Sequence, residues 1–240
     1  MKLDRITAYK KYLFDYLKFA RLMKGLKNRF SMNISDRLPC LKDNVGCTPF
    51  DRHYVFHTAW AARMLARSMP LSHIDISSSL HFCTIVSAFI PVTFYDFRPA
   101  ELNLLGLTSK SADILALPFA NDSISSLSCM HVVEHIGLGR YGDRVDPDGD
   151  LKAISELKRV LAIGGSLLFV VPVGKPVIMF NAHRVYSYEQ IVSYFSELKL
   201  EEFALIPDSP STGGLIQNAT KDMTDEQRYG CGCFYFKKVQ

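Results

Sequence analysis

The stretch that decides the fold class runs from Asp113 to Pro172. Along the chain it contains DILALPF (residues 113–119), MHVVEH (130–135), ELKRVL (156–161) and GGSLLFVV (164–171). This spacing predicts a strand that ends in polar residues, a helix over residues 150–161 that is closed by Gly164, and a buried strand over 166–171. Strands that alternate with helices in this way are typical of a mostly parallel sheet.

The alternation continues on both sides of this stretch. Further helices are predicted over residues 4–29, 51–68, 80–89 and 188–198, and further strands over 73–76, 92–96, 112–115, 126–131, 200–205 and 231–237. We therefore predict an α/β fold, a doubly wound Rossmann-like sheet of about seven strands with N-terminal helices. Residues 1–50 are expected to form a basic amphipathic helix and a linker, and residues 51–240 a Rossmann-like domain.

The composition bounds the class of protein. Of the 240 residues 48% are hydrophobic and 22% charged, and no apolar run approaches the roughly 20 residues that span a bilayer. The first residues are too charged for a secretory signal, and the six cysteines lack the spacing of a disulfide framework. We therefore expect a protein of the reducing cytoplasm.

The positive charge is concentrated at the start of the chain. Residues 1–30 hold nine Lys and Arg against two acids, so this segment has a net charge of +7. The whole chain has a net charge of +4, so the remaining residues have a net charge of −3. Because the main body is not basic, no nucleic-acid partner is expected. Two interpretations of the first helix stay open. It packs on the domain with its basic side in water, or residues 1–30 make peripheral contact with an anionic membrane surface.

Polar residues gather where the predicted strands end, which is where a doubly wound sheet binds its ligands. The residues at these positions are Asp75, Ser77 and Ser79 for the first strand, Asp96 for the second, Asp113 and Ile114 for the third, and His131, Glu134 and His135 for the fourth. We therefore predict a ligand site along this edge.

The order of elements from Asp113 to Pro172 resembles the second half of a class I S-adenosylmethionine (SAM) dependent methyltransferase. Residues 131–143 and 181–186 also resemble a methyltransferase-like family that is catalogued as a domain of unknown function. The resemblance covers most of the chain from about Tyr54 onward. It implies SAM as the cofactor and a class I methyltransferase fold.

The resemblance also implies roles for individual residues. Asp96 would accept hydrogen bonds from both ribose hydroxyls. Asp113 would accept from the adenine amino group while Ile114 covers the ring. Asp75, Ser77 and Ser79 would form the first cofactor loop, which usually reads Asp/Glu-x-Gly-x-Gly. Serine enters positive φ at a cost, so the loop either takes another path around the cofactor or binds it more weakly.

Catalytic candidates follow the fourth strand. His131, His135 and His183 are candidate general bases because imidazole titrates near neutral pH, and Arg140 is a candidate to bind a phosphate or carboxylate of the acceptor. We predict no metal here, because His131 and His135 would share one face only on a helix and a turn is expected. In the alternative interpretation, Glu134 and His135 only orient the loop.

The function predicted from these features is SAM-dependent methylation of an oxygen or nitrogen atom of a small-molecule or glycan-type acceptor. Such an in-line displacement needs an aligned nucleophile more than a strong base, so no catalytic triad is required. Two alternatives stay open. One is a non-catalytic methyltransferase-like binding or scaffold protein that has lost SAM, as the serine loop suggests. The other is a different nucleotide-binding Rossmann enzyme. The sequence does not determine the oligomeric state.

Overall fold

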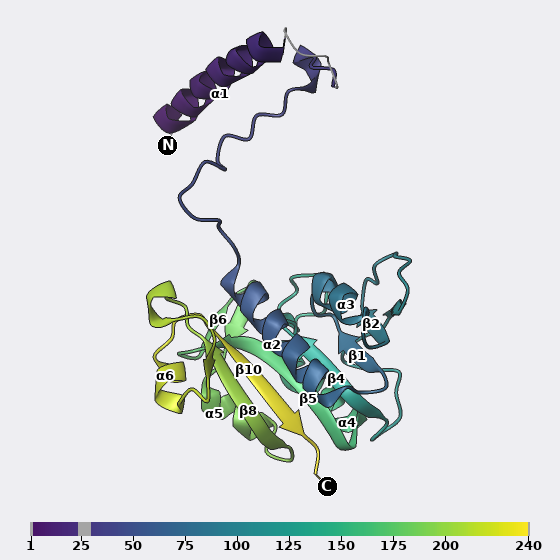
Figure 1. The fold of residues 1–240 in the computed structure, drawn as a ribbon. Coiled ribbons are helices and arrows are strands. Elements are labelled where there is room, and N and C mark those ends of the chain that lie inside the picture. Colours follow the sequence, from purple (N-terminus) through teal and green to yellow (C-terminus); the bar gives the residue numbers. More distant parts are fainter. Residues whose placement is uncertain (1, 24–29, 240) are drawn as a thin grey trace. The chain divides into compact units, whose positions relative to one another are not determined.

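The computed structural model describes residues 2–23 and 30–239 and divides the chain into two compact units, Met1–Phe50 and Asp51–Gln240 (Figure 1). In the first unit, α1 spans Lys2–Met23 and a 3-10 helix, η1, spans Ile34–Asp36. The predicted helix over residues 4–29 is thus present up to Met23, and its last six residues lie outside the described chain. Among the described residues, no helix is long and apolar enough to cross a bilayer.

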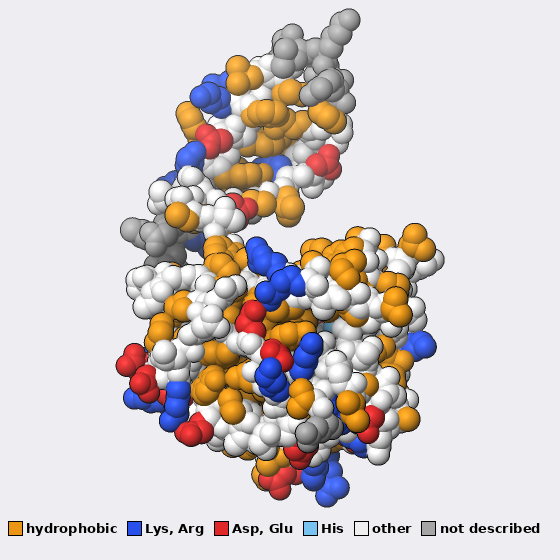
Figure 2. All heavy atoms as spheres, turned by 60° about the horizontal axis from the view of Figure 1, so that its bottom comes forward, with side chains coloured by type: hydrophobic (Ala, Val, Ile, Leu, Met, Phe, Trp, Pro, Cys, Tyr) orange, Lys and Arg blue, Asp and Glu red, His pale blue; other side chains and the backbone are white. Residues whose placement is uncertain are grey.

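Apolar side chains are exposed on α1. Ile6, Phe14, Leu17, Phe19 and Leu22 are each more than half exposed, and hydrophobic side chains gather on this helix in Figure 2. At 100° per residue Phe19 and Leu22 lie on the other side of the helix from Ile6 and Leu17, so the apolar residues do not form one narrow stripe. Packing and membrane contact both stay predictions for this helix.

The second unit is built on one sheet of eight strands within the described residues, in the order β3-β2-β1-β4-β5-β10-β8-β9. Its strands are β1 (His73–Ile76), β2 (Val92–Asp96), β3 (Leu107–Ser111), β4 (Ile124–Met130), β5 (Leu161–Val173), β8 (Lys199–Ile206), β9 (Ile216–Gln217) and β10 (Gly230–Lys237). The first five strands are parallel, while β10 runs antiparallel to both β5 and β8. The carboxyl ends of β1, β2, β3 and β4 therefore meet at one edge.

Helices cover both faces of this sheet (Figure 1). α2 (Arg52–Ser68) and α3 (Leu80–Val86) bury Trp60, Met64 and Phe82 against one face. α4 (Gly149–Val160) and α5 (Tyr188–Tyr194) bury Leu157 and Ile191 against the other. On the face drawn in Figure 2, acidic and basic side chains of this unit are interspersed.

Short elements complete the second unit. They are the 3-10 helices η2 (Val133–His135) and η3 (Pro210–Thr212), the antiparallel hairpin of β6 (Val177–Met179) and β7 (His183–Val185), and α6 (Lys221–Asp225). η2 follows β4 directly, and β7 also contacts η2. The hairpin therefore lies beside the loop that follows β4.

The predicted α/β doubly wound fold is confirmed, with two corrections. The sheet has eight strands instead of about seven, because the short strand β9 adds to the edge at β8. The prediction of a strand over residues 112–115 is wrong. The strand that pairs with β2 is Leu107–Ser111, and Asp113 begins a turn that closes on Ala116. Asp113 therefore lies just beyond the end of β3, in the loop.

Candidate active site

The first two turns of α2 carry two histidines towards the end of β4. The carboxylate of Asp51 caps this helix by accepting from the N–H of Tyr54 at 3.2 Å. His53 and His57 lie four residues apart and so share the face that also buries Trp60. The Nδ1–H of His57 donates to the carbonyl oxygen of His53 at 2.7 Å, because a carbonyl can only accept.

His131 follows the last residue of β4 in a left-handed conformation with φ +57°. Its backbone N–H donates to the carbonyl of Val170 at 2.8 Å, which holds the strained residue at the sheet edge. Its Nδ1 lies 2.8 Å from Oε1 of Glu134, and both side chains are buried. Strain of this kind, about 1–2 kcal/mol for a residue with a Cβ, is common at functional sites.

Five histidines lie in and beside the loop after β4, three of them close to Glu134. The rings of His53 and His57 are 5.3 and 5.1 Å from that of His131, and the rings of His135 and His183 are 6.5 Å apart. We call His53, His57, His131, His135 and His183 the histidine cluster. Tyr229 joins its two halves, because its ring lies 4.9 Å from His53 and 4.7 Å from His183.

Burial sets the protonation of this cluster. Loss of solvation, together with a smaller effect of the neighbouring His131, lowers the pKa of His53 to about 4 and that of His57 to about 3. Burial likewise lowers the pKa of His183. The same effect raises the pKa of Glu134 to about 7. At neutral pH the imidazoles are therefore uncharged, with one lone pair each.

His135 and Arg140 meet at one backbone oxygen. The Nδ1–H of His135 donates to the carbonyl of Ala182 at 2.6 Å, and Nη1 of Arg140 donates to the same oxygen at 3.0 Å. Because Nδ1 of His135 carries a proton, its 3.2 Å contact with Nη1 of Arg140 is not a hydrogen bond. The two side chains tie the loop after β4 to the β6–β7 hairpin.

The glycine-free loop after β1 takes a conformation that usually belongs to glycine. Ser77 has φ +54°, and its hydroxyl donates to the carbonyl of Tyr95 at 3.2 Å. Ser78 accepts from the N–H of Met130 at 3.0 Å, which ties the loop to β4. Ser79 precedes α3 as its N-cap residue. The serine substitutions therefore keep a left-handed residue in this loop, at a cost in strain.

Asp75 lies beneath this loop and is fully buried. One carboxylate oxygen accepts from the N–H of Ser78 at 3.0 Å, and the other accepts from the hydroxyl of Ser128. Ser128 and Ser126 also flank His73, 2.8 Å from its Nε2 and Nδ1. Burial raises the pKa of Asp75 to about 6. This polar chain shapes the loop from below, while contact of Asp75 with a ligand stays a prediction.

Asp75→Asn should make stability less dependent on pH. The raised pKa of Asp75 in the folded state means that its contribution to stability is fully present below pH 4 and is lost as the pH rises through about 6. Asparagine keeps the oxygen that accepts from Ser78 and can donate to Ser128. Between pH 4 and 6 we expect the free energy of unfolding of the variant to rise relative to that of the wild type, by up to about 3 kcal/mol. Urea unfolding across this range measures the difference, and a constant difference would contradict the assignment.

Asp96 and Asp113 both lie at the edge where the carboxyl ends of the parallel strands meet. Asp96 ends β2, and its Oδ1 accepts from the N–H of Arg98 at 2.7 Å. Within residues 2–23 and 30–239, no hydrogen-bond partner is recorded for its other oxygen. Asp113 is exposed and accepts from the N–H of Leu115 at 2.9 Å, while Ile114 is buried in the core. Each aspartate thus shapes a turn with one oxygen, and the predicted cofactor roles of these residues stay predictions.

An open pocket of about 530 Å³ adjoins the histidine cluster. His183 and Tyr229 line it on the side of the cluster, and Asp208, Ser209 and Arg228 add polar groups. Nε2 of His183 is buried and has no hydrogen-bond partner among the described residues. The volume lies within the range of sites for small molecules. The pocket is therefore large enough for a small molecule beside His183, with a mostly apolar lining and a few polar groups.

The structure brings together the four predicted catalytic residues, His131, His135, Arg140 and His183, around Glu134. Sequence reasoning missed His53 and His57 of α2, Cys231 of β10, and Tyr229, which directly precedes β10. One signal was present, because His53 and His57 are four residues apart at the start of a helix and so share one face.

The glycines of the loop after β4 serve the loop itself. A Cβ at Gly137 would lie 2.0 Å from the carbonyl oxygen of Asp146, so close packing of the chain requires glycine there. The carboxylate of Asp143 accepts from the N–H groups of Gly137 and Gly139 at 2.8 and 3.3 Å. These contacts fold the loop onto the start of α4.

Comparison with known families gives one match. The model of a family described as Caenorhabditis protein of unknown function, DUF268, matches residues 115–200. This range contains β4, the loop with Glu134, β5 and His183. No curated protein matches the chain.

Solved structures share the fold at low sequence identity. NodS, an N-methyltransferase from Bradyrhizobium japonicum WM9 solved with S-adenosylhomocysteine (SAH), is 16% identical, with 84% of this chain and 92% of that chain covered and a TM-score of 0.52. YcgJ from Bacillus subtilis is 14% identical, with 77% and 98% covered and a TM-score of 0.54. A chain in the complex of the Haloferax volcanii Trm112 methyltransferase activator with a methyltransferase is 19% identical, with 79% and 92% covered and a TM-score of 0.53. The fold is therefore that of class I methyltransferases.

Proposed function

We propose that this protein is a SAM-dependent methyltransferase that acts on an oxygen or nitrogen atom of a small-molecule or glycan-type acceptor. The observation that carries the proposal is the left-handed Ser77, which keeps a backbone conformation typical of glycine in the loop after β1. The methyltransferase fold and the aspartates at the ends of β2 and β3 add support. SAM would supply an electrophilic methyl group.

The chain's own residues fit such a cofactor. The free oxygen of Asp96 suits a ribose hydroxyl, and the exposed carboxylate of Asp113 suits the adenine amino group. Ser77 and Ser79 would border the cofactor along the loop after β1, above the buried Asp75. The scaffold alternative would be favoured if His81 or Phe82 filled the cofactor position, but His81 is exposed and Phe82 packs in the core.

The acceptor would lie in the pocket beside His183. The lining is mostly apolar, but Asp208, Ser209 and Arg228 offer partners to hydroxyl or amino groups of an acceptor, and the neutral imidazole of His183 can take up the proton that such a group loses. Incubation with SAM and a panel of sugars, glycosides and small amines, with SAH measured by mass spectrometry, tests the activity. We expect SAH to form with at least one acceptor of these classes.

Asp96→Asn should weaken SAH binding by about 10- to 150-fold. Asparagine keeps the oxygen that accepts from Arg98 but replaces the second acceptor by an amide, so the turn survives and a ribose contact is lost. A lost hydrogen bond to a charged group costs about 1.5–3 kcal/mol. Calorimetric titration with SAH measures the change, and Glu101→Gln in the nearby exposed loop is the matched control. Equal affinity in both variants would reject the ribose assignment.

His135→Ala and Arg140→Ala should impair methylation of the acceptor by about 10- to 150-fold while SAH affinity stays within a few-fold. The reason is that the cofactor contacts come from the ends of β1, β2 and β3, and the acceptor is held near the loop after β4. A purely structural role through the Ala182 carbonyl predicts another outcome, in which melting temperature and SAH affinity fall together. Both quantities are therefore measured for each variant.

A further inference from the structure

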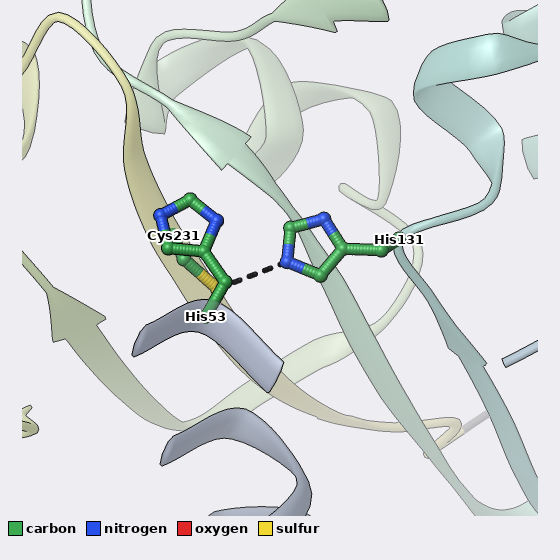
Figure 3. A group of neighbouring side chains, drawn as sticks. All are labelled: His53, His131 and Cys231. Carbon is green, nitrogen blue, oxygen red and sulfur yellow. Dashed lines mark hydrogen bonds between the residues drawn. The ribbon is translucent and has the colours of Figure 1, made fainter. Parts of the chain in front are cut away.

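Three side chains from distant parts of the sequence converge beside the histidine cluster. Figure 3 shows His53 from α2, His131 from the end of β4 and Cys231 from β10. One ligand atom from each lies within 4.8 Å of the other two, and all three residues are buried. The Sγ of Cys231 is 3.4 Å from Nε2 of His131. We propose that these residues bind a zinc ion, a site that goes beyond the proposed methyl transfer.

The separations suit tetrahedral zinc. Zinc–nitrogen bonds of about 2.0–2.1 Å and zinc–sulfur bonds of about 2.3 Å place the ligand atoms of a tetrahedron roughly 3.3–3.6 Å apart. The pair of Cys231 and His131 already has such a separation at 3.4 Å. No other pair exceeds 4.8 Å, so small rotations of the side chains complete the site.

Each imidazole is oriented by a partner on its other nitrogen. Nδ1 of His131 faces the carboxylate of Glu134 at 2.8 Å, which leaves the lone pair on Nε2. Nε2 of His53 lies 3.2 Å from the carbonyl oxygen of Tyr229, so Nε2 carries the proton and Nδ1 the lone pair. Histidine ligands of metal ions are held in this way, with the second nitrogen donating to a carboxylate or carbonyl.

The surroundings hold more lone pairs than donors. Nε2 of His57 is buried without a hydrogen-bond partner in the described chain, and so is Oε2 of Glu134. The rings of His57 and His131 are only 5.1 Å apart. Among residues 30–239, the structure records one donor that faces the lone pair of one of these histidines. It is the thiol of Cys231, which faces Nε2 of His131. A cation balances this excess of buried acceptors.

The ligand set points to a transition metal. Two imidazoles and one thiolate suit zinc or copper, whereas magnesium and calcium prefer oxygen ligands, and we assign zinc because the separations suit a tetrahedron. Coordination forms the Zn–S bond, and the proton of the Cys231 thiol passes to solvent. Three protein ligands leave a fourth position for water or another ligand. In this site His131 is a ligand, so the proton from the acceptor falls to His183.

The test uses the full chain in which the exposed Cys40 and Cys47 are replaced by serine, so that surface thiols do not bind metal. After treatment with a chelator, the protein is titrated with zinc chloride by calorimetry and with cobalt(II) by absorption. We expect one zinc per chain and a thiolate-to-cobalt charge-transfer band. Absence of saturable zinc binding would overturn the proposal.

Variants locate the ion. Cys231→Ser should weaken zinc binding by at least about 100-fold and abolish the cobalt band, and Glu134→Gln, which alters the partner of His131, should weaken it by about 10–100-fold. Cys129→Ser is the matched control, because Cys129 is also buried in a strand but packs on the opposite face of the sheet. Wild-type affinity in Cys231→Ser would overturn the site. If that variant does not fold, zinc affinity is measured for His53→Asn instead, and wild-type affinity in that variant would likewise overturn the site.

Discussion

Replacing His183 by alanine is expected to lower the rate of methyl transfer by about 10²–10⁴-fold, the usual contribution of a general base. His183 lines the pocket, and its buried Nε2 has no hydrogen-bond partner among the described residues. Burial lowers the pKa of His183, so its lone pair is free at neutral pH. Turnover is measured with the acceptor that the SAH screen identifies.

Two measurements separate chemistry from stability in this variant. SAH affinity should stay within a few-fold, because the cofactor contacts that we propose lie at the ends of β1, β2 and β3. The matched control is His81→Ala, which removes an exposed imidazole at the first turn of α3. Full activity of His183→Ala would show that another group takes the proton, or that the acceptor lies elsewhere.

Replacing Gly137 by alanine is expected to destabilise the second unit by about 3 kcal/mol or more. The added Cβ would meet the carbonyl oxygen of Asp146 at 2.0 Å, and φ is +81°, so the backbone itself must move. The same N–H and carbonyl groups of Gly137 bind Asp143 and Asp146, so the loop after β4 is expected to open.

Gly142→Ala is the control for this prediction. Gly142 also has a positive φ, +86°, but no atom of the described chain lies within 4 Å of the added Cβ. Its substitution should therefore cost only the strain of the left-handed conformation, about 1–2 kcal/mol. Chemical unfolding of both variants measures the two costs. Equal losses would show that the packing at Gly137 contributes nothing.

The fold was predictable because local patterns and the global topology agree. Helical spacing in residues 150–161 and a continuous apolar run in 166–171 indicated α4 and β5, and the structure contains both. The third strand was misplaced, because only Leu107 of Leu107–Ser111 is apolar and buried, so the segment gives no strong apolar signal. The position of that strand is set by its pairing with β2, which is a tertiary contact.

The candidate site was predictable only in part. Strand ends indicated His131 and His135, because parallel strands deliver their carboxyl ends to one edge. The contributions of His53 and Cys231 depend on how α2 and β10 pack beside that edge, which is a tertiary property. Sequence reasoning likewise expected serine to disfavour positive φ, whereas hydrogen bonds from Ser77 to Tyr95 hold it there.

The central claim is that the edge formed by β1, β2 and β3 binds SAM, and calorimetric titration of the wild-type protein with SAH tests it most directly. We expect saturable binding of one SAH per chain, which is weakened in Asp96→Asn. No detectable heat and no thermal shift at millimolar SAH would contradict the claim and favour a scaffold that has lost its cofactor.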